Sequence, residues 1–157
     1  MKIGISLIVL TYGIDRICKW LVVDVLNISD QSITIFPFLN MVFVRNTGIS
    51  FGMLQNENAL SQWFLAIFAF LVIIFLLAWL FRSNSKILSA GLGMVIGGAA
   101  GNATDRVIWG HVVDFINFHI GNWHYPVFNI ADIAIVCGFG LILLDGLFVR
   151  RHKGITG

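Results

Sequence analysis

Two aspartates in apolar surroundings are the residues of this chain best suited to chemistry. Asp114 lies within the run 112–115, and Asp132 closes the run 128–132. Two carboxylates in a low-dielectric cleft share one proton, because ionising both is costly. In that state the ionised member can take a proton from water while the protonated member polarises a carbonyl. This is the chemistry of peptide hydrolysis by an aspartyl protease.

Two other hypotheses compete with this one. A proton relay in a small membrane transporter would use the same carboxylates, and spacing alone leaves protease and relay equally open. A purely structural polar cluster would instead match each carboxylate with a base. Four helices without an internal repeat are unlike most transporters. The four histidines show no metal-ligand spacing and no His-Glu-x-x-His motif occurs, so we expect no metal and no cofactor.

Polar residues on the segment before Asp114 follow helical spacing. Gly98, Asn102, Asp105 and Arg106 stand at i, i+4, i+7 and i+8, so we expect them to face one way. Asn102 suits holding a peptide backbone or a carboxylate, or simply bonding a neighbouring helix. Gly98 shares this face. Its simplest role is structural, since small residues in a glycine-rich segment allow tight helix packing.

Two further pairs are spaced for contact. Asp15 and Lys19 stand four apart near the end of the first apolar segment, which predicts a structural ion pair that could also shape the site. Asn129 and Asp132 stand three apart at the start of the last apolar segment, which places them on one helix face.

The elements that position these residues are membrane helices. Of the 157 residues, 58% are hydrophobic and only 11% are charged, and the mean hydropathy is +0.89. A soluble domain carries about 25% charged residues, so much of this surface faces lipid. The net charge of +2 and the dispersed basic residues give no sign of nucleic-acid binding. Spanning a bilayer takes about 20 apolar residues, and four segments qualify: about 3–23, 63–81, 87–108 and 128–149.

The flanking charges predict the orientation. With four spans, one side collects most of the basic residues: Lys2, Arg82, Lys86, Arg150, Arg151 and Lys153. We therefore expect both termini in the cytoplasm and the aspartates at the outer face. Residues 24–62 and 109–127 form the outer segments. Within the first, the run 32–44 is rich in Ile, Phe, Val and Thr and interrupted by Pro37, which predicts extended strands on the membrane surface.

The chain resembles a known family, the bacterial lipoprotein signal peptidases, also called type II signal peptidases. Five segments occur in that family's order across about the whole chain: Asp15-Arg16-Ile17-Cys18-Lys19, residues 45–52 (RNTGISFG), residues 97–106 (GGAAGNATDR), residues 112–115 (VVDF) and residues 126–132 (PVFNIAD). Two positions depart from the usual pattern. Arg16 stands where the family has Gln, and Ile49-Ser50 stands where it has two alanines.

The resemblance implies an aspartyl endopeptidase of the bacterial inner membrane that removes signal peptides from diacylglyceryl-modified prolipoproteins, before the lipidated cysteine. It also implies globomycin sensitivity and a small β-cradle on the membrane surface, formed by strands around residues 33–51. Asp114 and Asp132 match the catalytic pair, and other matching positions would line or support the site: Asn46, Asn102, Arg106, Asn129, Asp15 and Lys19. We expect one membrane domain over residues 1–157, in contact with membrane lipid and acting as a monomer.

Overall fold

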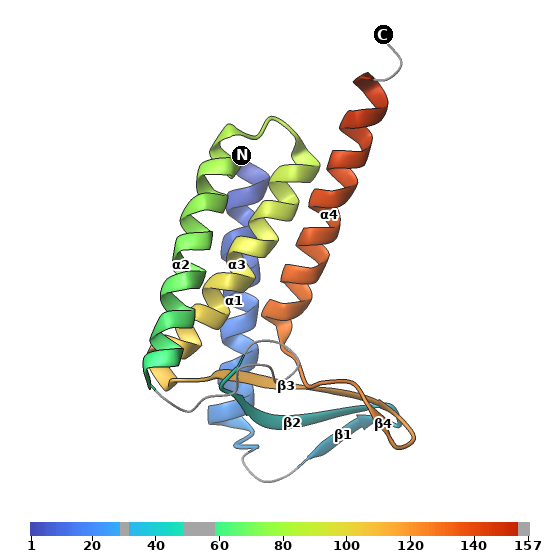
Figure 1. The fold of residues 1–157 in the computed structure, drawn as a ribbon. Helices are drawn as coiled ribbons and strands as arrows, with labels where there is room; N and C mark the ends of the chain where they lie inside the picture. Colours follow the sequence, from blue (N-terminus) through green and yellow to red (C-terminus); the bar gives the residue numbers. More distant parts are fainter. Residues whose placement is uncertain (29–31, 49–58, 154–157) are drawn as a thin grey trace.

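The computed structural model describes residues 1–28, 32–48 and 59–153, with side chains described as far as Leu147. Within these ranges the chain forms four long helices, and a small antiparallel sheet lies at one end of them (Figure 1). Residues 49–52, the end of the expected motif at 45–52, lie outside this description, as do the side chains of Arg150, Arg151 and Lys153. The elements are α1 (Lys2–Trp20), η1 (Leu21–Val25), β1 (Ile33–Phe36), β2 (Leu39–Asn46), α2 (Ala59–Arg82), α3 (Lys86–Trp109), β3 (Val112–Ile120), β4 (Trp123–His124) and α4 (Ile130–Lys153).

The helices alternate in direction. The N-terminus, the α2–α3 turn and the far end of α4 lie at one end, and the sheet lies at the other (Figure 1). Among the described residues, three helices are long and apolar enough to cross a membrane: α2, α3 and the part of α4 up to Leu147. These helices indicate a multi-pass membrane protein. The predicted spans at 63–81 and 87–108 lie within α2 and α3.

The first predicted span, 3–23, is helical but not uniform. α1 ends at Trp20 and continues as the π-helical turn η1, in which the N–H of Leu26 bonds the carbonyl of Leu21 at 2.8 Å. Three charged residues lie in its last two turns: Asp15, Arg16 and Lys19. Because of these charges, α1 is not among the three helices named above as long and apolar enough to cross a membrane.

The sheet is built from two hairpins in the order β1-β2-β3-β4, with all neighbours antiparallel. The prediction of strands within residues 32–44 is confirmed, with the turn at Pro37-Phe38. No strand was predicted in residues 109–127, where β3 and β4 lie. Their signal was present in the two-residue turn Gly121-Asn122, since Gly121 has the positive φ of 57° that such hairpins require.

α3 is the central helix and packs against α1, α2 and α4. Glycines allow the close approach. A Cβ at Gly93 would lie 2.4 Å from the carbonyl oxygen of Gly4 in α1, and one at Gly91 would lie 2.6 Å from that of Gly138 in α4. In lipid, where hydrophobic burial does not drive helix association, such backbone contact supplies the packing. The predicted packing role of the glycine-rich segment is thereby confirmed.

Candidate active site

Asp114 projects from β3 at the point where the sheet meets the helices. It is 2% exposed. Asn46 Nδ2 donates to its Oδ2 at 2.8 Å, and Asn129 Nδ2 donates to its Oδ1 at 2.7 Å. The register explains the first contact, because Asp114 lies opposite Val44 and Asn46 follows on the same face of β2.

The electrostatics of Asp114 favour the protonated form. Burial, and next the charge of Asp132, raise its pKa from 3.8 to about 7, against the two asparagine hydrogen bonds, which lower it. Each cause is physical: removal from water disfavours the anion, and so does a second carboxylate nearby. Near neutral pH, Asp114 is therefore a carboxyl group that can carry a proton.

Asp132 lies in the first turn of α4 and takes part in a reciprocal cap. The N–H of Asp132 donates to Asn129 Oδ1 at 3.0 Å, and the N–H of Asn129 donates to Asp132 Oδ2 at 3.1 Å. This is the capping-box arrangement, which satisfies two N–H groups at the helix start. The positive end of the helix dipole favours negative charge at this position.

Asn129 and Asn102 connect the two carboxyl groups. Asn129 is fully buried, and besides its bond to Asp114 its Nδ2 lies 3.1 Å from Asn102 Oδ1. Asn102 Nδ2 in turn donates to Asp132 Oδ1 at 2.9 Å. The structure thus joins α3, α4 and the sheet through one chain of amide and carboxylate contacts.

A fully buried ion cluster lies behind Asn102. The Lys19 ammonium is 2.8 Å from Asp15 Oδ2 and 2.6 Å from Asp105 Oδ2, and all three side chains are 0% exposed. The predicted Asp15–Lys19 pair is therefore confirmed. Arg16 also pairs with Asp105.

The same cluster reaches the sheet and α4 through backbone groups. Asp105 Oδ2 accepts the N–H of Val113 at 3.2 Å, and Asp15 Oδ1 accepts the N–H of Ala131 at 3.0 Å. Val113 and Ala131 immediately precede Asp114 and Asp132 in sequence. The ion cluster thus holds the backbone beside each carboxyl group.

The four α3 positions predicted to share one face, Gly98, Asn102, Asp105 and Arg106, meet different neighbours. Asp105 turns toward α1, as just described, whereas Arg106 Nη2 donates to the carbonyl of Gly48 at 2.9 Å. Gly98 lies at the contact with α4, where a Cβ would be 2.5 Å from the carbonyl oxygen of Ala131. One helix face is wide enough to meet several neighbours, so the spacing did not predict which neighbour each residue meets.

Both carboxyl groups line one cavity of about 120 Å³. Its wall comes from β2, β3, the segment before α4, and α4 itself: Asn46, Asp114, Tyr125, Pro126, Val127, Phe128, Asp132 and Val136. An adjoining, mainly apolar hollow of about 240 Å³ continues along α4 to Cys137, and it shares four lining residues with this cavity: Tyr125, Phe128, Asp132 and Val136. The sequence interpretation missed these apolar wall residues, although Asp132 and Val136 stand four apart on one helix face.

The chain is similar to known proteins over most of its length. The family model described as signal peptidase (SPase) II matches residues 7–148. A lipoprotein signal peptidase of Methylocella silvestris is 40% identical over 99% of this chain and 91% of its own length. One of Coxiella burnetii is 44% identical over 92% of this chain and 90% of its own.

Solved structures are similar over nearly the whole fold. A bacterial membrane enzyme determined by the in meso method at 2.3 Å resolution superposes with a TM-score of 0.83 and 29% identity, covering 98% of this chain and 92% of that one. A second, determined at 1.9 Å, has a TM-score of 0.77 and 30% identity, with 94% of each chain covered.

Proposed function

The chain belongs to the signal peptidase II family, and from this premise we propose that it is an intramembrane aspartyl endopeptidase. Its substrates are prolipoproteins modified with diacylglycerol, and it cleaves the peptide bond immediately before the lipidated cysteine. Asp114 and Asp132 form the catalytic pair. The observation that carries the proposal is that both carboxyl groups line one cavity and are bridged by Asn129.

The two carboxyl groups have different roles. Asp114, whose pKa is raised to about 7 chiefly by burial, carries the proton and polarises the scissile carbonyl. Asp132, at the positive end of α4, is the carboxylate that takes a proton from water. As that water attacks, Asp114 gives its proton to the carbonyl oxygen, which yields a neutral tetrahedral diol. When the C–N bond breaks, Asp132 gives the proton it took from water to the leaving amine, and Asp114 regains a proton from a hydroxyl of the diol.

The asparagines and the ion cluster hold this pair in position. Asn46 and Asn102 each donate to one carboxyl group, and Asn129 contacts both. Arg106 holds the end of β2 through Gly48. The buried ion cluster fixes the backbone beside the catalytic residues, because Asp105 and Asp15 accept the N–H groups of Val113 and Ala131. Gly98 serves this arrangement by letting α3 and α4 approach.

The apolar hollow beside the cavity suits a substrate that stays in the bilayer. It runs along α4 past Val136, which is 70% exposed on the outer surface of the helix. A soluble protease would have to extract a lipidated cysteine at a cost of about 0.8 kcal/mol per methylene group. A site that opens sideways at helix ends avoids this cost.

We also propose that the chain crosses the membrane four times. α1 is the fourth span, because Asp15 and Lys19, the charged residues deepest in it, are paired and fully buried instead of facing lipid. Residues 1–157 then form one membrane domain in the bacterial inner membrane, with both termini cytoplasmic and the sheet acting as a cradle at the outer face. The protein works as a monomer without a metal or other cofactor.

Cleavage of a diacylglyceryl-modified prolipoprotein by the purified full chain in detergent tests the proposal. Mass spectrometry should find a product that begins at the modified cysteine, and globomycin should block its formation. Asp114→Asn and Asp132→Asn should each lower kcat by about 10²–10⁴-fold, the usual contribution of one acid–base group. Full activity in either variant, with a normal melting profile, would contradict the assignment.

Asp24→Asn is the matched control, since Asp24 is an exposed carboxylate at the sheet end of the molecule. The transporter alternative predicts a different readout, namely proton flux into liposomes that is lost in the same variants. Along α4 the next carboxylate after Asp132 is Asp145, about 20 Å away at 1.5 Å per residue. That gap is long for a proton relay.

A further inference from the structure

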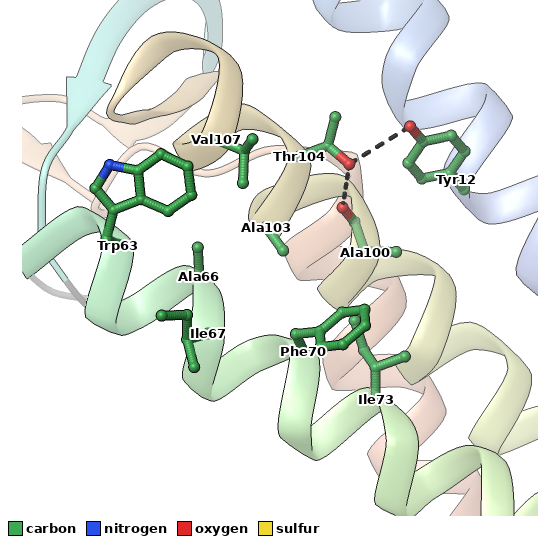
Figure 2. A pocket seen from close by; sticks show the side chains of 10 residues that line it. All are labelled: Tyr12, Trp63, Ala66, Ile67, Phe70, Ile73, Ala100, Ala103, Thr104 and Val107. Atoms are coloured by element: carbon green, nitrogen blue, oxygen red, sulfur yellow. Dashed lines mark hydrogen bonds between the residues drawn. The ribbon is translucent and has the colours of Figure 1, made fainter.

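A cavity of about 560 Å³ lies apart from the two carboxyl groups, where α1 and α2 meet α3. None of its lining residues also lines the carboxylate cavity. Its volume falls within the range of about 300–1,000 Å³ that is typical of small-molecule sites. Figure 2 shows side chains of α2 and α3 around it, with Tyr12 of α1 approaching Thr104 at one side.

The cavity is open because small side chains stand where helices would otherwise interlock. Ala66 of α2 and Ala100 and Ala103 of α3 contribute only methyl groups to its wall (Figure 2). Its rim is apolar and outward-facing: Ile67 is 56% exposed and Phe70 is 62% exposed. Since α2 and α3 are both long and apolar enough to cross a membrane, this rim meets lipid hydrocarbon and not water.

A cation lies beyond the cavity toward the sheet. Arg16 follows Tyr12 by four residues and therefore stands one turn farther along the same face of α1. Its guanidinium lies 4.9 Å from the ring centre of Trp109, the last residue of α3. The ion pair with Asp105 engages one guanidinium nitrogen, and 23% of the Arg16 side chain is exposed. Arginine and tryptophan together are typical of the level of lipid headgroups.

We propose that this cavity binds one acyl chain of an anionic phospholipid from the leaflet on the sheet side, with the headgroup phosphate at Arg16. The apolar, lipid-facing rim requires an occupant that is apolar and comes from the bilayer, and the partly exposed Arg16 guanidinium favours one with negative charge at its end. An anionic phospholipid meets all three conditions. A second copy of the chain would have to insert a helix about 10 Å wide, which the cavity of about 560 Å³ cannot admit at useful depth. The proposal is independent of the protease assignment.

Native mass spectrometry of the full chain in detergent tests the site, with phosphatidylglycerol and phosphatidylcholine of identical acyl chains as probes. Ala103→Phe fills the cavity and should weaken phosphatidylglycerol binding about tenfold, as expected for a steric clash with a seated chain. Ala78→Phe makes the same change on the exposed surface of α2, outside the cavity, and should leave binding unchanged. If Ala103→Phe fails to fold, Ile67→Trp narrows the cavity from its rim and should give the same loss.

The headgroup is tested separately. Arg16→Gln should weaken phosphatidylglycerol about fivefold, the effect of one cation near an anionic lipid surface. It should weaken phosphatidylcholine less, because the choline cation offsets the phosphate charge in that lipid. Equal binding by Ala103→Phe, Ala78→Phe and the unmodified chain would overturn the proposal. So would a dimer that Ala103→Phe dissociates, since a second copy would then be the occupant. Asp114→Asn should bind the lipid normally, so loss of protease activity and loss of this site can be told apart.

Discussion

The ammonium group of Lys19 donates to Oδ1 of Asn102 at 3.1 Å, and this contact determines which way the amide faces. An ammonium group has donors only, so the amide oxygen must turn toward Lys19. The amide nitrogen then faces Asp132 Oδ1 at 2.9 Å. The buried ion cluster therefore orients a donor toward one of the two proposed catalytic carboxyl groups.

Replacing Lys19 by Met should destabilise the protein by about 3–5 kcal/mol, because Asp15 and Asp105 would remain buried without their shared cation. Thermal unfolding in detergent measures the effect. Lys2→Met removes an exposed cation from the same helix and should leave the melting temperature unchanged. Equal melting of the two variants would show that the cluster contributes no net stability.

Asn129 can be tested for its two contacts separately. Asn129→Ser retains a hydroxyl that can cap α4, whereas Asn129→Ala loses the cap, which should cost about 1 kcal/mol more. Neither side chain can donate an amide hydrogen to Asp114. We therefore expect both variants to lose activity, by about 10²-fold, while only Asn129→Ala also loses appreciable stability. Near-normal turnover by Asn129→Ser would mean that the contact with Asp114 is dispensable.

The rate should depend on pH through Asp114. Because burial and Asp132 raise the pKa of Asp114 to about 7, the protonated carboxyl group is present below that pH and is lost above it. We expect kcat/KM to fall with rising pH beyond about 7. Asn46 donates a hydrogen bond that lowers this pKa, so Asn46→Ala should move the alkaline limb to higher pH. A limb that stays in place, or moves to lower pH, would contradict the role of Asp114 as the acid.

The α3–α4 contact predicts a sharp difference between two glycines. A Cβ at Gly98 would lie 2.5 Å from the carbonyl of Ala131, the residue before Asp132, whereas one at Gly140 would meet nothing within 4 Å. Gly98→Ala should therefore cost about 1–3 kcal/mol and lower kcat by moving Asn102 away from Asp132. Gly140→Ala should be neutral or stabilising by up to about 1 kcal/mol. Matched melting temperatures and rates for the two variants would rule out close packing at Gly98 as a requirement.

Much of the helical architecture could be predicted from the sequence, for a simple physical reason. Long apolar runs in lipid must satisfy their backbone hydrogen bonds internally, so they become helices wherever they occur. The Asp15–Lys19 pair was predictable as well, since a spacing of four residues on one helix makes it a local contact. The motif order along the chain also indicated the family, which the comparisons confirm.

The arrangement of the site needed the tertiary structure. Helical spacing put Asp105 and Arg106 on one face, but only packing decided that Asp105 meets Lys19 of α1 while Arg106 meets Gly48. Likewise, the pairing of β2 with β3, which brings Asn46 to Asp114, joins segments far apart in sequence.

Local periodicity determines which residues share a face, because it follows from backbone geometry alone. Which neighbour that face meets depends on close contacts among all the helices and strands at once. The reciprocal bonds of Asn129 and Asp132 show both levels. Their spacing was readable in the sequence, and the tertiary structure decided that Asn129 also reaches Asp114.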